Sequence, residues 1–404
     1  MDFEDTPAEA TFRSQAKEWL SANASPLGAG DNFETEEKLL QAARAWQRLL
    51  QQDGFAAITL PAEYGGGGRT AIEQVIFRQE QSNFDIPFGV YEIGMGMCIP
   101  TIVALGSEAL KQRYVPPAIR GEDIWCQLFS EPSAGSDLAA VRTRAVRQGH
   151  NWIVNGQKIW TTGAQFSDYG LLLARTEPDA PKHAGLTLFI VDMKAAGISV
   201  RPIRMITGES EFNEVFFHDV EISDTNRLTE PGKGWAGART TLMFERLNVG
   251  GEIGLIDHRE LVRLTSQLEI DGAPAIQNSM VRERLANWYI NDRALKLLNF
   301  QTLTALGQGE LPGPEQSISK LVIASQVQKM ADLALDLREE EGVLAGDDLG
   351  TDWRGIERAW SFGAAMRIAG GTDEILRNII SERVLGLPPE PRADLPTNQR
   401  KPGS

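Results

Sequence analysis

The sequence has little cysteine and histidine: two cysteines, Cys98 and Cys126, and four scattered histidines in 404 residues. Two cysteines are too few for a disulfide framework, and we expect both to pack as small apolar groups. There is no His-x-x-x-His pair and no Cys-x-x-Cys motif, so no metal site built by the protein is predicted. A Gly-x-Ser-x-Gly motif is also absent, which argues against a serine hydrolase of the α/β type.

Long apolar runs and basic clusters are absent as well. No apolar run is long enough to cross a bilayer, and residues 1–10 carry acids where a secretory signal carries basic residues and an apolar core. The 40 basic and 55 acidic residues give a net charge of -15, which disfavours nucleic acid and anionic membranes as partners. We therefore expect a soluble, cytoplasmic protein that holds any anionic ligand with a local group of residues.

Hydropathy periodicity divides the chain into helical and β-type parts. Apolar residues recur at helical spacing in the first and last parts, and short β-type runs separated by turn signals such as Asn155-Gly156 lie between them. Strands between two blocks of helices predict an α+β fold whose middle part is a small antiparallel barrel or sandwich. The expected parts are a helical domain 1–122, a β domain 123–234, a helical domain 235–388 and a disordered tail 389–404.

Two local signals need interpretation. Gly232-Lys-Gly-Trp-Ala-Gly237 matches the pattern Gly-x-Gly-x-x-Gly. Dinucleotide binding by this pattern requires a buried strand before it, whereas the polar loop Ser223–Pro231 precedes it, so we interpret it as a turn before a helix. A helix that begins near Ser107 is expected to end at Pro116-Pro117, because proline has no N–H to donate.

Two stretches in the β-type part indicate a binding site. Gln127-Leu-Phe-Ser-Glu-Pro-Ser-Ala-Gly-Ser-Asp137 combines hydroxyls and small residues that can present backbone N–H groups to a planar heterocycle or a phosphate. Ile153-Val-Asn-Gly-Gln-Lys-Ile-Trp-Thr-Thr-Gly163 is predicted to form a hairpin that places a tryptophan beside two threonines. A buried tryptophan with hydrogen-bonded threonines is the alternative that these residues leave open.

Both stretches closely resemble the flavin-binding segments of the acyl-CoA dehydrogenase family. The resemblance continues in family order through Pro61–Gly66, Asn213–Val220, Gly232–Trp235 and Gly370–Ile380, so it covers nearly the whole chain. It implies FAD as cofactor and a fold with an N-terminal helical domain, a β-barrel domain and a C-terminal four-helix bundle. The implied reaction converts an acyl-CoA to the trans-2-enoyl-CoA, with the β-hydride passing to flavin N5 and the electrons to an electron-transfer flavoprotein.

The resemblance implies roles for residues around the isoalloxazine ring. Gln127, Phe129 and Ser130 would line this ring, with Ser130 bonded to its polar edge. Trp160 and Thr162 would cover its other side, with Thr162 near N5.

Further residues match family positions at the rest of the site. Gly135 and Ser136 would lie beside the FAD pyrophosphate or the pantetheine arm of the substrate. Gly371, Thr372 and Glu374 match the C-terminal segment that closes on the cofactor.

The proton acceptor departs from the common family pattern. Many members carry a glutamate directly before the Gly-Thr of the C-terminal segment, where this chain has Gly370. The chain has a Glu245-Arg246 pair in the first helix of the C-terminal bundle, as in members that resemble isovaleryl- and long-chain acyl-CoA dehydrogenases. Glu245 is therefore the predicted base, Gly370 is expected to polarise the thioester carbonyl with its backbone N–H, and Arg246 to approach the CoA. A structural pairing of Glu245 with Arg239 or Asn248 is the alternative.

Two family segments that act between subunits are missing. Gln267–Gln277 stands in place of an Arg-x-x-Phe-Gly segment, and Trp360–Ile368 in place of an Ile-x-Gly-Gly-x-Gly motif. We therefore expect the adenine end of FAD to be held differently, in a homo-oligomer or in a pairing with another chain of the family. Two other functions stay open: a flavin oxidase or monooxygenase on the same fold, and a non-catalytic partner subunit.

Overall fold

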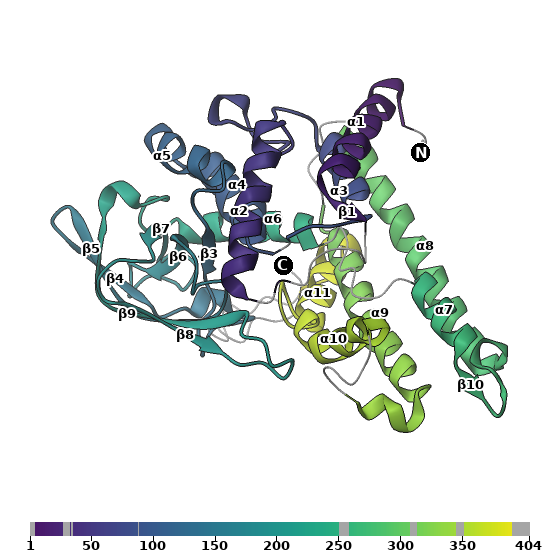
Figure 1. Ribbon diagram of the computed structural model, residues 1–404. Helices are drawn as coiled ribbons and strands as arrows, with labels where there is room; N and C mark the ends of the chain where they lie inside the picture. Colours follow the sequence, from purple (N-terminus) through teal and green to yellow (C-terminus); the bar gives the residue numbers. More distant parts are fainter. Residues whose placement is uncertain are drawn as a thin grey trace. The chain divides into compact units, whose positions relative to one another are not determined.

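The computed structural model describes residues 5–26, 33, 35–87, 89–249, 258–307, 313–344 and 351–389. The chain forms two compact units, Asp2–Glu245 and Arg246–Ser404 (Figure 1). Within the described ranges, no helix has the length and apolar character needed to span a membrane. All but the first residue of the predicted tail 389–404 lies outside the described residues.

The first unit begins with helices whose starts are fixed by hydroxyl side chains. The N-cap side chains of Thr6, Thr35, Thr70 and Ser107 each accept a backbone N–H in the first turn, as expected for helix starts. The elements are α1 (Pro7–Asn23), β1 (Ser25–Pro26), α2 (Glu36–Gln52), η1 (Ala62–Tyr64), α3 (Ala71–Gln81), β2 (Phe84–Asp85), η2 (Gly94–Cys98), α4 (Ile99–Leu105) and α5 (Glu108–Ile119).

The predicted end of α5 at Pro116-Pro117 is wrong, because the helix continues through both prolines to Ile119. Val115 and Ile119 in this last stretch are fully buried. Their burial contributes about 1.5–3 kcal/mol each, which offsets the two N–H groups that the prolines lack. Tertiary packing therefore extends this helix beyond the point that the local sequence predicts.

A seven-stranded sheet follows in the same unit, in the order β3-β6-β4-β5-β9-β8, with β7 paired to β6. The strands are β3 (Trp125–Leu128), β4 (Arg144–Gln148), β5 (Asn151–Thr162), β6 (Tyr169–Arg175), β7 (Leu186–Asp192), β8 (Ile198–Ile203) and β9 (Phe212–Ser223). Their pairing is antiparallel as predicted, except that β6 is parallel to β3 and to β4. Helices and sheet share one apolar core, in which Cys98 packs, while Cys126 packs in a second core on the sheet. Both cysteines are free and buried, which confirms the prediction for them.

Asn155-Gly156 is not the turn that its sequence predicts, because β5 runs straight through it. The partner strand β9 contains a bulge at this level, where Asp219 adopts a φ of 48°. The Asn155 side chain donates to the Asp219 carboxylate at 2.9 Å and accepts its backbone N–H at 3.0 Å. Residues 153–162 of the predicted hairpin therefore belong to one long strand, and Asn155 holds a bulge instead of a turn.

The second unit is mainly helical. It contains α7 (His258–Gln267), β10 (Glu269–Ile270), β11 (Ala273–Pro274), η5 (Ala275–Gln277), α8 (Ser279–Gly307), α9 (Gln316–Asp336), η6 (Glu339–Val343), α10 (Thr351–Met366), α11 (Asp373–Ile379) and η8 (Ile380–Val384). Helices α7 to α10 pack around one apolar core. The segment Gln267–Gln277, which departs from the family pattern, forms a hairpin with Asp271 and Gly272 at positive φ in its turn.

Candidate functional site

Trp160 lies at a β-bulge in β5. Between Lys158 and Thr161, β5 contains one more residue than the paired segment of β9, and Trp160 has a φ of 59°. The extra residue shifts the alternation of side chains along the strand. Lys158 and Thr161 are buried, whereas Trp160 is 57% exposed and Thr162 is half-buried. The bulge therefore turns Trp160 and Thr162 to the outward side of the strand.

The stretch that contains Ser130 lies directly beside this bulge. The backbone N–H of Ile159 donates to the carbonyl oxygen of Ser130 at 3.0 Å, which joins the two stretches predicted to bind flavin. Within the part of the chain that the structure describes, the hydroxyls of Ser130 and Thr162 bond to no protein group, and Thr161 Oγ1 is buried without a partner. The hydroxyls of Ser130 and Thr162 beside an exposed aromatic ring fit the flat, polar-edged ring system of FAD, whereas Thr161 lies on the buried side of the strand.

A buried ion pair that the sequence analysis missed lies next to these groups. Lys158 Nζ donates to Glu131 Oε1 at 2.8 Å, and the two side chains are 0% and 5% exposed. Burial lowers the pKa of Lys158 to about 8. Burial raises the pKa of Glu131, but the charge and hydrogen bond of Lys158, together with the hydrogen bonds from Arg142 and Thr143, outweigh it, so that pKa lies below its usual value. Glu131 lies in the stretch Gln127–Asp137, and Lys158 lies in the stretch Ile153–Gly163. Only their contact with each other in the structure indicates a role for them.

Gly135 and Ser136 lie at the tip of the loop that leaves Glu131. Ser136 is exposed, and a Cβ placed on Gly135 would meet no atom within 4 Å. The neighbouring Asp137 forms an ion pair of 3.0 Å with Lys182. Arg175 donates to two backbone carbonyls of residues 139–141 at 2.6 and 3.0 Å, so the loop is held at its base while its tip stays open.

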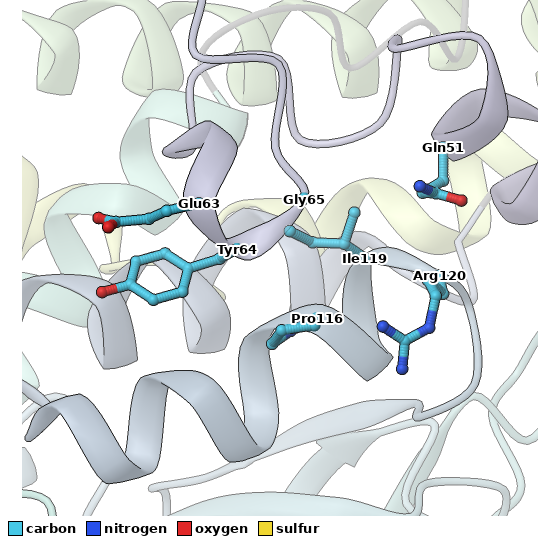
Figure 2. Close-up of a pocket in the computed structure, with 7 residues that line it drawn as sticks. All are labelled: Gln51, Glu63, Tyr64, Gly65, Pro116, Ile119 and Arg120. Carbon is cyan, nitrogen blue, oxygen red and sulfur yellow. The ribbon is translucent and has the colours of Figure 1, made fainter.

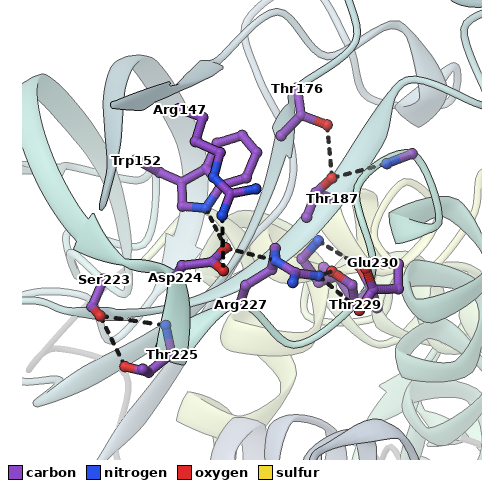
Figure 3. Close-up of polar contacts among 12 residues, drawn as sticks. Arg147, Trp152, Thr176, Thr187, Ser223, Asp224, Thr225, Arg227, Thr229 and Glu230 are labelled. Carbon is purple, nitrogen blue, oxygen red and sulfur yellow. Dashed lines mark hydrogen bonds and ion pairs between the residues drawn. The ribbon is translucent and has the colours of Figure 1, made fainter. Parts of the chain in front are cut away.

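A polar network anchors the segment that leads from the sheet into α6 (Gly234–Val249), as Figure 3 shows. Asp224 accepts hydrogen bonds of 2.8 Å from Trp152 Nε1 and from Arg227 Nε. Thr187 Oγ1 accepts the backbone N–H of Gly232 at 3.2 Å. Gly232 turns with a φ of 77°, and the segment is therefore tied to β5 and β7 before α6 begins.

Helix α6 carries the predicted base Glu245. A Cβ on Gly234 would lie 2.5 Å from the backbone nitrogen of Thr187, so glycine here permits close packing of the helix on β7. The turn before a helix is confirmed at Gly232, and the remainder of the motif from Gly234 onward is already the first turn of α6. Thr101 Oγ1 in α4 donates to Thr241 Oγ1 at 3.1 Å, and the half-buried Glu245 lies one turn further along the same face. The side chain of Arg246 lies outside the described residues.

The remaining predicted residues lie in the second unit. Gly370 and Gly371 have φ values of 66° and 103°, and Thr372 Oγ1 caps α11 by accepting the N–H of Ile375. The buried Lys320 donates to the carbonyl oxygen of Gly371 at 2.5 Å. Glu374 is exposed, at 76% of its side-chain surface. The turn is thus held rigidly by groups of its own unit.

Two pockets in the structure contain none of the predicted site residues. One of about 200 Å³ lies between η1 and α5, and it is lined by Gln51, Glu63, Tyr64, Gly65, Pro116, Ile119 and Arg120 (Figure 2). The other, of about 550 Å³, is lined by Val262, Ile276, Gln277, Arg282, Leu285, Ala286 and Tyr289. The first is smaller than a typical ligand site.

Comparison with known proteins identifies the family. Sequence models of the N-terminal, middle and C-terminal domains of acyl-CoA dehydrogenases match residues 6–122, 126–220 and 232–385. The chain belongs to the acyl-CoA dehydrogenase family. It is 36% identical over 386 residues to the acyl-CoA dehydrogenase IpdE1 of Mycobacterium tuberculosis, which covers 94% of this chain and 98% of that protein.

Solved structures of acyl-CoA dehydrogenases share the fold. The ChsE4-ChsE5 complex from Mycobacterium tuberculosis matches with a TM-score of 0.79 and 28% identity over 96% of this chain and 100% of that chain. The Tcur3481-Tcur3483 steroid acyl-CoA dehydrogenase matches with a TM-score of 0.80 and 26% identity over the same shares. As an acyl-CoA dehydrogenase, the protein is an oxidoreductase that acts on CH–CH groups, in a family that generally depends on FAD.

Proposed function

We propose that this acyl-CoA dehydrogenase binds FAD and converts an acyl-CoA thioester to the trans-2-enoyl-CoA, with Glu245 as the base that removes the α-proton. FAD, when bound, accepts the two electrons that leave the β-carbon, and an electron-transfer flavoprotein accepts them next. The observation that carries the proposal is the Trp160 bulge, which turns Trp160 and Thr162 outward beside Ser130. The N-terminal helical, middle β and C-terminal helical parts are proposed as the three domains of this enzyme.

The assignment of Glu245 rests on position. The position before Gly371 is a glycine without a carboxylate, whereas Glu245 lies on the face of α6 that also carries the buried Ala238 and Thr241. In this proposal the backbone N–H of Gly370 polarises the thioester carbonyl, and Arg246 approaches the CoA. Gln127, Phe129 and the tip of the Gly135 loop complete the proposed contacts to cofactor and substrate, together with Ser136, Gly371, Thr372 and Glu374.

The deciding experiment compares Glu245→Gln with the wild type and with Glu122→Gln. Glu122 is a surface carboxylate paired to Arg120, so its variant controls for loss of a glutamate. We expect Glu245→Gln to lose about 10²–10⁴-fold in turnover while it still binds FAD, because this is the usual contribution of a positioned general base. Normal turnover of Glu245→Gln would contradict the assignment.

The substrate and the partner chain are proposed from the relatives. One similar structure is named a steroid acyl-CoA dehydrogenase, and the names of two similar structures each pair two chains. A ring-bearing acyl-CoA and an oligomer with a second family chain are therefore proposed, since the missing side chain at Gly370 leaves room for a bulky acyl group. Anaerobic flavin bleaching with straight, branched and ring-bearing acyl-CoAs tests the substrate. Oxygen consumption by the reduced protein would favour an oxidase. A purified protein that is colourless and inactive would favour a non-catalytic subunit.

A further inference from the structure

The proposed function leaves unused the most deeply buried ion pair that the structure describes beside the site. The Lys158 ammonium donates to Glu131 Oε1 at 2.8 Å and to the carbonyl oxygen of Phe129 at 2.9 Å. The Glu131 carboxylate also accepts the backbone N–H groups of Arg142 at 2.6 Å and Thr143 at 2.9 Å. One ion pair therefore joins three separate backbone segments.

General stability does not explain such a pair. Burial of two charges has a large desolvation cost, and apolar replacements of similar shape are often equally stable or more stable. Hydrogen bonds from a buried charge to backbone groups are, however, directional, so they can specify one arrangement of the segments they join. The contacts of Lys158 and Glu131 are of this kind, because three of the four go to backbone atoms.

The contacts of Lys158 affect the direction in which Trp160 and Thr162 face, because Lys158 lies directly before the bulge. Lys158 is the last inward-facing residue of β5 before the bulge at Trp160. A slip of the strand by one residue would reverse the facing of every side chain beyond it, and would turn Trp160 and Thr162 inward. The backbone of Lys158 pairs with Val215 of β9, whereas its side chain bonds to the segment 129–131, so the side chain constrains the bulge in addition to strand pairing.

On the basis of the proposed function, we infer that Lys158 and Glu131 are positioning residues for FAD. They hold the Trp160 bulge and the Phe129–Ser130 peptide where the isoalloxazine is proposed to bind. The ammonium also polarises the Phe129 carbonyl, which makes the N–H of Ser130, in the same peptide, a stronger donor. A stronger donor at the polar edge of the flavin stabilises the reduced cofactor, so the pair raises its midpoint potential.

The test uses the full chain and four proteins: the wild type, Lys158→Met, the double variant Glu131→Gln/Lys158→Met, and the control Asp224→Asn. Asp224 holds Trp152 at the other end of the same strand and lies in the network of Figure 3. For each protein, the dissociation constant of FAD from the apoprotein, the midpoint potential of bound FAD and the thermal stability of the apoprotein are measured.

We expect Lys158→Met to weaken FAD binding at least tenfold and to make the midpoint potential more negative. The double variant should regain stability, because no charge is left unpaired. Its FAD binding should nevertheless stay weakened, because a methionine side chain has no N–H group to hold the Phe129 carbonyl. Asp224→Asn should lose stability without a change in FAD affinity or potential.

The outcomes separate the inference from the function on which it rests. Wild-type affinity and potential in the double variant would overturn the inference alone, since a purely structural role predicts that recovery. If Lys158→Met does not fold, the double variant decides by the same criterion. A wild-type chain that binds no FAD would contradict the proposed function, and the inference with it.

Discussion

Gly156 in β5 approaches Thr143 so closely that a Cβ on Gly156 would lie 2.5 Å from Thr143 Oγ1 and 2.6 Å from its Cα. The backbone of Gly156 also has a φ of 154°. The contact matters for the site because Thr143 donates its N–H to the carboxylate of Glu131 at 2.9 Å. Thr143, the residue before β4, therefore links the close contact with Gly156 to the buried ion pair.

Gly156→Ala should therefore lower the free energy of unfolding and weaken FAD binding. Overpacking of this kind costs about 1–3 kcal/mol, and the alanine is also strained at this φ. Gly149→Ala is the matched control, since Gly149 has a φ of 62° but no atom within 4 Å of a Cβ. Urea unfolding and FAD titration of both variants test this, and equal effects of the two substitutions would show that the contact with Thr143 is unimportant.

The buried ion pair predicts a pH dependence of stability with a definite sign. The pKa of Glu131 is lowered in the folded wild type, so its contribution to stability is present above its ordinary pKa and is lost as the pH falls through the lowered value. In Lys158→Met, burial without the lysine raises this pKa, so the variant gains stability as its carboxyl is protonated.

The stability difference between wild type and Lys158→Met should therefore shrink on acidification. At neutral pH it should be about 3–5 kcal/mol, the usual cost of breaking a buried pair. Urea unfolding of the apoproteins between neutral pH and about pH 4 measures this difference. Lys194→Met removes an exposed lysine that pairs with Asp168, and it should cost about 1 kcal/mol or less. A difference that stays constant with pH would contradict the assigned coupling.

Gly135 offers a test of ligand proximity that is free of folding effects. A side chain at this position would meet no protein atom within 4 Å, so Gly135→Ala should change the free energy of unfolding by less than about 0.5 kcal/mol. If FAD or the pantetheine arm approaches the backbone here, Gly135→Val should weaken binding of one of them at least tenfold. Separate titrations with FAD and with acyl-CoA identify which, and unchanged affinity for both would place the ligands elsewhere.

Trp160 combines an exposed ring with a backbone conformation that costs energy. Trp160→Gly relieves the cost of a left-handed φ, which is about 1–2 kcal/mol for a residue with a side chain. The same substitution removes the edge-to-face contact with Phe212, which stabilises the fold by about 0.5–1.5 kcal/mol. Because the two effects oppose each other, the stability of the apoprotein should change little. FAD affinity should fall at least tenfold, because the aromatic cover is lost. Trp160→Phe keeps a ring and should retain most of the affinity, as measured by FAD titration. Wild-type FAD affinity in Trp160→Gly would show that Trp160 is not part of the FAD site.

Local signals were sufficient for much of the fold. Helix starts at Thr70 and Ser107 follow from a hydroxyl that accepts an N–H three residues later, and this is a property of adjacent residues. The alternation between helical and β-type parts was also visible, because each element buries one face at its own period. The motifs around Ser130 and Trp160 were sufficient for the family, since they match in order along nearly the whole chain.

What the sequence alone determined about this protein is therefore its family and its order of elements, and it also named the residues that are proposed for its site. Only the tertiary structure decided how those residues face: the bulges at Trp160 and Asp219, the passage of α5 through Pro116-Pro117, and the pairing of Lys158 with Glu131. The physical reason is distance along the chain. Lys158 and Glu131 are 27 residues apart and Thr101 and Thr241 are 140 apart, and contacts of this range leave no period or turn signal in the local sequence.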